Sequence, residues 1–457
     1  MRNLQDYMSI SQYLNYHPLK KESFEVKVRY LNVLEYFSNK YQRTNVFTMA
    51  MLRNYKKYLL GDAFSKYKYY EADIRKIARD VASRKFVWHR FYTYRFILMI
   101  DCFFLIAFDD LELAKVLFED LKKVLDSWFY NMVYGQKMID LFDLLYYNKK
   151  SERKLDFTDY PINCWQANSY YFNLEAKKIL ITANMSAGKS TLINALIGKS
   201  VTQTKNDACT AKLHYIQSKA FEDGFAYEND YILELNADYF TLMDDNQHNI
   251  YNRITVGTFF RLASGINKKV CFIDTPGVNS SQDKKHRQLT EQAIEERNYD
   301  KVVYVINGEN IGSNDDNQYM NYIADKVKNK KIFFVVNKLD RFKKDEDSIA
   351  ESIKAIYAEV NAMGFKDFAV CPVSAYAGLL GKKALWNEEL NEDEKDELSL
   401  FIRKYKKKDY DLTSFYSVNR IKKCNDIVAA EKDEVKKKYL QMLNNAGILA
   451  LENILLE

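Results

Sequence analysis

Apolar residues recur at helical spacing in the first third of the chain. Val26, Tyr30 and Phe37 are separated by four and seven residues, which places them on one face of a helix. Glycine and proline, which interrupt helices, are nearly absent from residues 1–187. The pattern predicts an all-helical N-terminal domain over residues 1–150 with a core rich in aromatic side chains.

From Lys177 onward the pattern changes to short β-branched runs separated by helical segments. The runs read KILITA, KVCFID, KVVYVIN, KIFFVVN and FAVCPVS. Strands that alternate with helices indicate a mostly parallel sheet with helices on both faces. We therefore predict an α/β domain over residues 177–457. A polar and irregular segment over residues 151–176 is predicted to link it to the helical domain.

The most hydrophobic run of the chain covers residues 96–108 and contains Asp101. A helix needs about 20 apolar residues to cross a bilayer, and this run is shorter. It therefore predicts a buried core helix. The N-terminus has no apolar segment of the kind found in signal peptides.

Composition places the chain among soluble globular proteins. Its 457 residues are 47% hydrophobic and 28% charged, which excludes an extended disordered chain. A net charge of +6 is a small excess on this size of protein and favours a balanced, solvated surface. The six cysteines form no CxxC pair, so neither a zinc site nor a disulfide framework is indicated, and reduced thiols in a cytoplasm fit best.

Candidate chemistry begins where the first predicted strand ends. Residues 183–190 read ANMSAGKS, which follows the phosphate-binding pattern GxxxxGK[ST] except that Ala183 replaces the first glycine. Backbone N–H groups of such a loop bind phosphate at a helix N-terminus. Lys189 is expected to reach the β- and γ-phosphates, and the Ser190 hydroxyl to ligate Mg²⁺. The loop residues expected to bind nucleotide are Ala183, Asn184, Met185, Ser186, Ala187, Gly188, Lys189, Ser190 and Thr191.

A second motif, DTPG at residues 274–277, ends the predicted strand KVCFI. The carboxylate of Asp274 can hold Mg²⁺ through a water molecule. The N–H of Gly277 can meet the γ-phosphate. Together with the loop at residues 183–190, the motif predicts a site for a triphosphate and its metal.

Two further motifs indicate which base is bound. The strand KIFFVV ends in NKLD, where Asn337 and Lys338 precede Asp340. A fixed aspartate can accept from N1–H and from the 2-amino group of guanine, a donor pair that adenine lacks, and each such bond contributes about 1.5–3 kcal/mol. The Lys338 stem can cover the base, and a backbone N–H at Ser374 and Ala375 would meet guanine O6. Four motifs in this order, each at the carboxyl end of a strand, predict a guanine-nucleotide P-loop GTPase.

The assembled motifs resemble the dynamin superfamily, and most closely the bacterial dynamin-like proteins. The resemblance covers about residues 177–375 and includes MSAGKSTLINALIG at residues 185–198. KNDACTAK at residues 205–212 is similar to that family's switch I, which implies that Thr210 closes over Mg²⁺; Thr204 and Thr202 match less well. The resemblance implies GTP and GDP as ligands, a homodimer formed through the GTPase domain, and action on a membrane or protein partner. The implied metal ligands are Ser190, Thr210 and Asp274.

One departure from the family bears on hydrolysis. Met185 stands where eukaryotic dynamins have the glutamine that orients the attacking water, and no arginine lies in the phosphate loop or in residues 199–212. An arginine finger can raise the rate by about 10³–10⁵. Ser186 matches a family serine associated with a charge-compensating K⁺ or Na⁺. We expect slow basal hydrolysis that rises when two GTPase domains meet. The residues expected to act in hydrolysis are Lys189, Ser186, Thr210 and Gly277.

Two other functions stay open at this stage. One is a GTP-gated switch or scaffold with little hydrolysis, whose helical domain docks a protein. The other resembles the immunity-related GTPases, although those differ around the aspartate–glycine and base-reading motifs. No basic patch interleaved with aromatic residues is present, so no nucleic-acid partner is expected. A cytoplasmic protein is expected, peripheral at the inner face of a membrane if it acts on one.

The C-terminal part predicts a helical insertion over residues 376–444, with helices over 391–405 and 426–443. Lysine-rich stretches at 404–408 and 436–438 have acidic neighbours, which favours a solvated helix face over a lipid-binding patch. Residues 445–457 resemble the final helix of a GTPase domain. Because the chain then stops, we expect that it does not tubulate liposomes alone.

Overall fold

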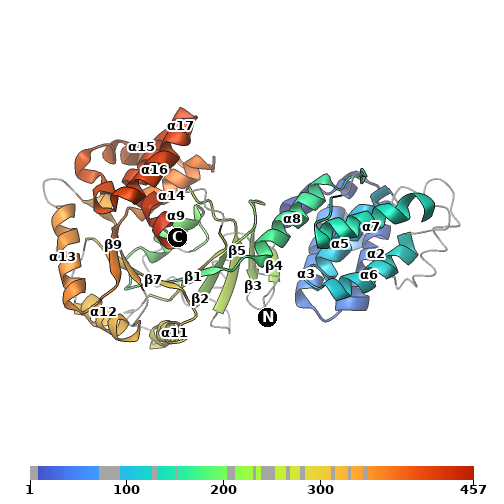
Figure 1. The fold of residues 1–457 in the computed structure, drawn as a ribbon, viewed down its shortest axis with the longest axis horizontal. Helices are drawn as coiled ribbons and strands as arrows, with labels where there is room; N and C mark the ends of the chain where they lie inside the picture. Colours follow the sequence, from blue (N-terminus) through green and yellow to red (C-terminus); the bar gives the residue numbers. More distant parts are fainter. Residues whose placement is uncertain are drawn as a thin grey trace. The chain divides into compact units, whose positions relative to one another are not determined.

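The structure, a computed structural model, divides into two compact units that are described separately (Figure 1). The first contains Met1–Leu174, Lys219–Tyr227 and Ile232–Asn236, and the second contains Glu175–Ser218, Glu228–Tyr231 and Ala237–Glu457. The residues described are 9–70, 93–125, 131–150, 153–202, 212–229, 233–237, 253–263, 268–277, 284–309, 314–327, 331–342 and 348–457.

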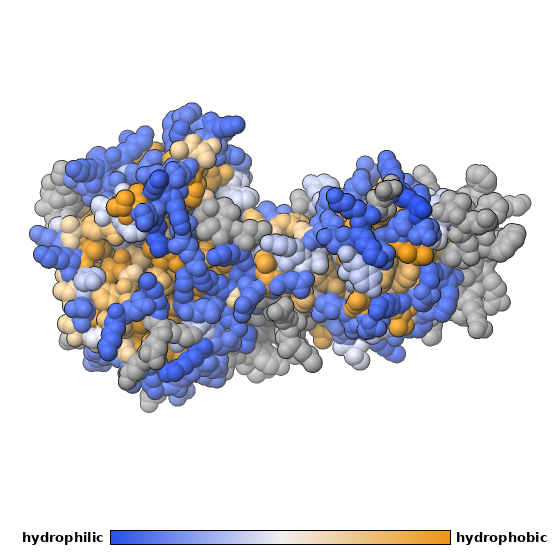
Figure 2. All heavy atoms as spheres, in the orientation of Figure 1, coloured by the Kyte–Doolittle hydropathy of each residue, from blue (hydrophilic) through white to orange (hydrophobic). Residues whose placement is uncertain are grey.

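The N-terminal part of the first unit is helical, which confirms the prediction for the described residues. Its most hydrophobic helix, α5, is buried along its whole length, as expected for a core helix. Hydrophilic residues cover most of the face of this unit that Figure 2 shows. The elements are α1 (Ser11–Asn15), η2 (Pro18–Lys21), α2 (Phe24–Gln42), α3 (Val46–Leu60), η3 (Gly61–Lys66), α5 (Arg95–Ile106), α6 (Leu111–Leu125), α7 (Asn131–Tyr147) and α8 (Asp159–Asn173).

The linker predicted over residues 151–176 is wrong for most of its length, because α8 occupies it. Trp165 of α8 is buried, its ring centroid lies 4.6 Å from that of Phe108, and its Nε1 donates to Leu145 O at 2.9 Å. Pro161 suggested an irregular segment. It lies in the first turn of α8, where the missing N–H has no helical acceptor to lose.

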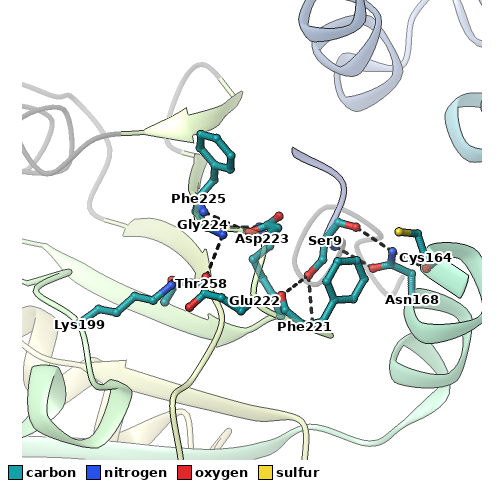
Figure 3. A network of polar contacts seen from close by, with 11 residues as sticks. Ser9, Cys164, Asn168, Lys199, Phe221, Glu222, Asp223, Gly224, Phe225 and Thr258 are labelled. Carbon is teal, nitrogen blue, oxygen red and sulfur yellow. Dashed lines mark hydrogen bonds and ion pairs between the residues drawn. The ribbon is translucent and has the colours of Figure 1, made fainter. Parts of the chain in front are cut away.

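A segment distant in sequence completes the polar framework of the first unit (Figure 3). Ser9 N donates to Asn168 Oδ1 at 2.7 Å, and Asn168 Nδ2 donates to Ser9 O at 2.9 Å. Ser9 Oγ donates to Phe221 O at 2.9 Å. Residues 219–227, which follow a strand of the second unit, are thereby fixed to α8 of the first.

The core of the first unit surrounds a buried carboxylate. Asp101 of α5 accepts from the hydroxyls of Tyr13 at 2.5 Å, Tyr55 at 2.9 Å and Tyr30, and His17 Nε2 lies 3.0 Å from it. Burial, and then the charge of Asp101, hold the pKa of all three tyrosines far above the ordinary value. The three hydroxyls therefore remain donors, and they satisfy a charge that would otherwise be costly in an apolar core.

We expect Asp101→Asn to lower the free energy of unfolding of the helical unit by about 3 kcal/mol, because three charge-assisted bonds weaken and an amide N–H₂ group faces donors. Denaturant unfolding followed by tryptophan fluorescence measures the change. Asp143→Asn is the matched control, since Asp143 pairs with Lys149 near the surface and should change stability by about 1 kcal/mol or less. Equal stability of the two variants would contradict a central role for Asp101.

The second unit contains a mostly parallel sheet, which confirms the predicted fold class. Seven of its strands have the order β5-β2-β6-β1-β7-β8-β9. All pairings among these seven are parallel except that between β2 and β6. The strands are β1 (Lys177–Ala183), β2 (Leu213–Ser218), β5 (Arg253–Thr258), β6 (Val270–Asp274), β7 (Lys301–Asn307), β8 (Ile332–Asn337) and β9 (Phe368–Pro372).

The sequence pattern did not predict β2, β5, or the two short strands β3 (Ala226–Asn229) and β4 (Leu233–Ala237) of the same nine-stranded sheet. All six residues of β2, LHYIQS, are buried although half of them are polar. The fully buried strands that were predicted, such as β6 and β8, are recognised by an unbroken apolar run. The polar residues of β2 interrupt such a run, so the sequence gives no signal for this strand.

Helices cover both faces of this sheet (Figure 1). The helices α11 (Lys284–Glu295), α12 (Asn314–Lys326) and α13 (Ile349–Ala362) lie on one face. On the other face lie α9 (Lys189–Ile197), α14 (Ala375–Leu385) and the C-terminal helices. No helix in the described ranges has the length and apolar character needed to span a bilayer.

The predicted helical insertion is present, with one correction. The helix predicted over 391–405 is α15 (Glu392–Lys404), capped by Asn391. The single helix predicted over 426–443 is instead two, α16 (Val418–Ala430) and α17 (Glu434–Asn445). Asp433 interrupts it because its side chain accepts from Val435 N and Lys436 N and so starts a new helix.

The last predicted helix, over residues 445–457, is α18 (Ile448–Leu456), and it belongs to the core of the second unit. Gly447 precedes it with φ of 78°, and a Cβ at this position would overlap Pro372 O. A glycine is therefore required where α18 meets the end of β9. In addition, Ser374 N donates to Ala446 O at 3.1 Å.

Candidate functional site

The loop predicted to bind phosphate connects β1 to α9. Ser186 and Gly188 have φ of 60° and 83°, in the left-handed region. A Cβ at Gly188 would overlap Asn337 Nδ2, so only glycine fits there. Ala183 is a buried residue of β1 and has no positive φ, which explains why this strand end tolerates a Cβ in place of the first glycine.

A buried ion pair lies where the loop meets β6. Lys189, the first residue of α9, pairs with Asp274, the last residue of β6, and their side chains are 8% and 0% exposed. Asp274 Oδ2 has no hydrogen-bond partner within the described residues. Leaving such an oxygen unsatisfied costs about 1–3 kcal/mol. A hydrated Mg²⁺ would satisfy it, so Asp274 and the neighbouring Ser190 fit this metal.

The segment after β6 passes beside the phosphate loop. Thr275 fixes its course, because Thr275 Oγ1 donates to Ile181 O of β1 at 3.2 Å. A Cβ at Gly277 would lie 3.4 Å from Met185 Cγ. The structure therefore brings the second predicted motif and the predicted phosphate loop together, with the Met185 side chain beside Gly277.

The third and fourth motifs also meet. Asn337, at the end of β8, donates from Nδ2 to Ala187 O at 3.1 Å and accepts at Oδ1 from Ala375 N at 3.0 Å. Ser374 Oγ donates to Asp340 Oδ1 at 2.7 Å. Asn337 thus connects the phosphate loop to the residues predicted to read the base, and Ser374 orients the carboxylate of Asp340.

Lys338, the residue after Asn337, has a left-handed backbone conformation with φ of 66°. Its Nζ is 3.5 Å from Glu309 Oε2, and Arg341 Nη1 is 3.2 Å from the same oxygen. Glu309 follows β7 and was not singled out in the sequence. It forms an ion pair with the side chain of Lys338, one of the residues predicted to contact the base.

The predicted switch threonine, Thr210, and the weaker candidate Thr204 lie outside the described residues. The third candidate, Thr202, is buried and forms hydrogen bonds to residues of α9. Its N donates to Asn194 Oδ1 at 2.9 Å, and its Oγ1 lies 3.1 Å from Ser190 O. Thr202 therefore closes the turn after α9, and Ser190 and Thr191 remain at the start of that helix.

One contact to the turn that carries Asp340 was missed by sequence reasoning. Lys404 at the end of α15 contacts the turn η5 (Leu339–Arg341), which carries Asp340. The sequence showed Lys404 only as part of a lysine-rich stretch. No local signal distinguishes it from the neighbouring exposed lysines, because the contact spans two elements far apart in the chain.

Comparison with known proteins gives one family match. Residues 179–339 match the family model described as "Dynamin family". No curated protein matches the chain. A similar solved structure is "Crystal structure of Era in complex with MgGDPNP and nucleotides 1506-1542 of 16S ribosomal RNA", with 20% identity over 44% of this chain and 52% of that one and a TM-score of 0.27. The chain thus spans about half of the length of the solved chain it matches.

Proposed function

We propose that this chain, which carries a dynamin-type P-loop GTPase domain, binds and hydrolyses GTP with Mg²⁺ and couples nucleotide-dependent dimerisation to remodelling of a membrane or partner. The observation that carries the nucleotide part is the convergence of four motifs at one sheet edge. Asn337 contacts both the phosphate loop and Ala375 N, and Ser374 contacts Asp340. Parallel sheets bind ligands at the carboxyl ends of their strands.

The roles of the chain's own residues follow from this arrangement. Lys189 can leave Asp274 for the β- and γ-phosphates, because both partners of the buried pair gain a new counter-charge when MgGTP enters. Asp274 and Ser190 would then hold Mg²⁺, which neutralises charge that develops on the phosphates. Asp340 accepts from the guanine edge, and Lys338 covers the base.

Hydrolysis is expected to need a second molecule. Met185 lies beside Gly277 and offers no hydrogen-bond donor to a water. A catalytic group missing from the site can be supplied by a partner GTPase domain. Ser186, with its left-handed backbone, is our candidate for the site of a K⁺ or Na⁺ ion in that assembly, and Thr210 for the residue that closes on the γ-phosphate.

We expect the specific GTPase activity to rise at least about tenfold over a hundredfold increase in protein concentration, since dimerisation is second order and a supplied catalytic group can give large rate factors. Steady-state phosphate release with GTP measures it, in K⁺, Na⁺ and choline buffers. Activity should require K⁺ or Na⁺, and ATP should give little release. Equal hydrolysis of ATP would overturn the assignment of the base.

A second candidate function rests on the same residue, Met185. A chain in which nothing replaces the missing glutamine would act as a GTP-gated switch or scaffold with little hydrolysis. Specific activity that stays flat over the dilution series, together with tight GTP binding, would favour this function. The cation dependence would then be absent as well.

A further inference from the structure

The turn that carries Asp340 is held by a helix of the C-terminal region. Lys404 Nζ, at the end of α15, donates to Asp340 O at 2.5 Å and to Phe342 O at 2.8 Å. The ammonium also lies 4.3 Å from the centroid of the Tyr410 ring. Burial lowers the pKa of Lys404, and the charge of Asp340 opposes that shift. One partly buried cation therefore bridges the middle residue of η5 and the residue that follows this turn.

The helix that presents Lys404 is itself anchored to the rest of the domain. Lys383 Nζ of α14 lies 3.0 Å from Glu394 Oε1 of α15, and Asn445 Nδ2 of α17 donates to Tyr405 O at 2.7 Å. Leu398 of α15 belongs to the hydrophobic core of the GTPase unit. The packing of α15 against the rest of the domain thus sets the position of the Lys404 ammonium.

The Asp340 residue is consequently fixed from two directions. Ser374 Oγ holds its carboxylate, and Lys404 holds its backbone carbonyl. Reading guanine requires one carboxylate to meet two adjacent donors at once. Displacement of a positioned group by about 1 Å can cost a factor near 10². A bond to the backbone of the reading residue is therefore a means of setting specificity.

We propose that Lys404 is a positioning residue for guanine recognition, through which the helical region after the last base-reading motif sets the preference for the 2-amino group of the base. The proposal rests on the proposed guanine binding at Asp340. It does not require Lys404 to touch the nucleotide, because its two acceptors are backbone carbonyls.

The test compares GDP with inosine diphosphate, which lacks the 2-amino group, by calorimetry in Mg²⁺ on the full chain. Wild type should prefer GDP by about tenfold or more, as expected for one charge-assisted bond. Lys404→Met keeps the apolar stem but removes the ammonium, and should weaken GDP binding about tenfold while inosine diphosphate binding changes less. The preference should fall to about threefold or below. Lys404→Arg should restore it, because guanidinium can donate to both carbonyls.

Lys406→Met is the matched control, since Lys406 is an exposed lysine two residues away, and it should leave both affinities unchanged. Melting temperatures of all variants are measured in parallel. Unchanged GDP preference in Lys404→Met would overturn the proposal, and so would an equal loss of affinity for both nucleotides with a lowered melting temperature. Wild type that binds neither diphosphate would instead overturn the proposed function, and the inference with it.

Discussion

Lys189→Ala should weaken GTP binding by at least about 100-fold, because two charge-assisted contacts to the β- and γ-phosphates are lost at about 1.5–3 kcal/mol each. Lys189 is 8% exposed and pairs with a fully buried carboxylate, so its ammonium is already shielded from water. Calorimetry with GTP and Mg²⁺ measures the change. Hydrolysis should fall below detection at GTP concentrations that saturate the wild type.

The same substitution leaves Asp274 without its cation. Breaking a buried pair from one side typically costs about 3–5 kcal/mol, so the melting temperature should also fall. Asp274→Asn separates the two effects: it removes the buried charge and should bind GTP without Mg²⁺ almost as well as the wild type. Lys178→Ala, at the half-buried start of β1, is the control for a lysine outside the site, where the ammonium donates to Asn298 Oδ1 at 2.7 Å. A Lys189→Ala variant that is folded and binds GTP normally would show that this loop is not the phosphate site.

Asp340→Asn should change the base preference of the site from guanine to xanthine. Asparagine can accept from N1–H and donate to the 2-oxo group of xanthine, whereas its amide N–H₂ opposes the 2-amino group of guanine. A site built on hydrogen bonds rejects a mismatched edge strongly, and we expect a loss of GTP affinity of about 10²–10⁴. Competition between GTP and xanthosine triphosphate in a binding assay measures both changes together.

The structure makes this variant a clean test. Ser374 Oγ can still donate to the side-chain oxygen of asparagine, and Lys404 contacts the backbone carbonyl, so the turn keeps its supports. Asp396→Asn, on the exposed surface of α15, is the matched control and should keep the guanine preference. GTP affinity equal to the wild type, with no gain for xanthosine triphosphate, would mean that Asp340 does not read the base.

The C-terminal helices show why some elements could be predicted and others could not. The helix over 391–405 was predicted from the helical spacing of its apolar residues, a signal carried by near neighbours in the chain. In the structure it starts at a capping box formed by Asn391 and Glu394. The break between α16 and α17 was missed because continuous apolar spacing outweighed the capping ability of Asp433. Pro161 had the opposite effect, and suggested an interruption where the first turn of α8 accommodates it.

The sequence by itself determined the phosphate loop, the DTPG and NKLD motifs and the strands that end in them. Each is a short local pattern, and the rule that parallel strands present their carboxyl ends at one edge places them together. It also determined that the apolar run at residues 96–108 contributes a buried helix, which ends at Ile106 in the structure. These inferences need only neighbours in the chain.

The tertiary structure decided which side chains complete those motifs. The tyrosines around Asp101 come from other helices, and His17 comes from the turn between α1 and η2. Ser374 reaches Asp340 from the start of α14, and Lys404 reaches the same turn from α15. A lysine that holds a turn and a lysine in solvent have the same sequence signature. Only packing of distant elements fixes where an ammonium or a hydroxyl lies, because the free energy of such contacts depends on burial and distance and not on position along the chain.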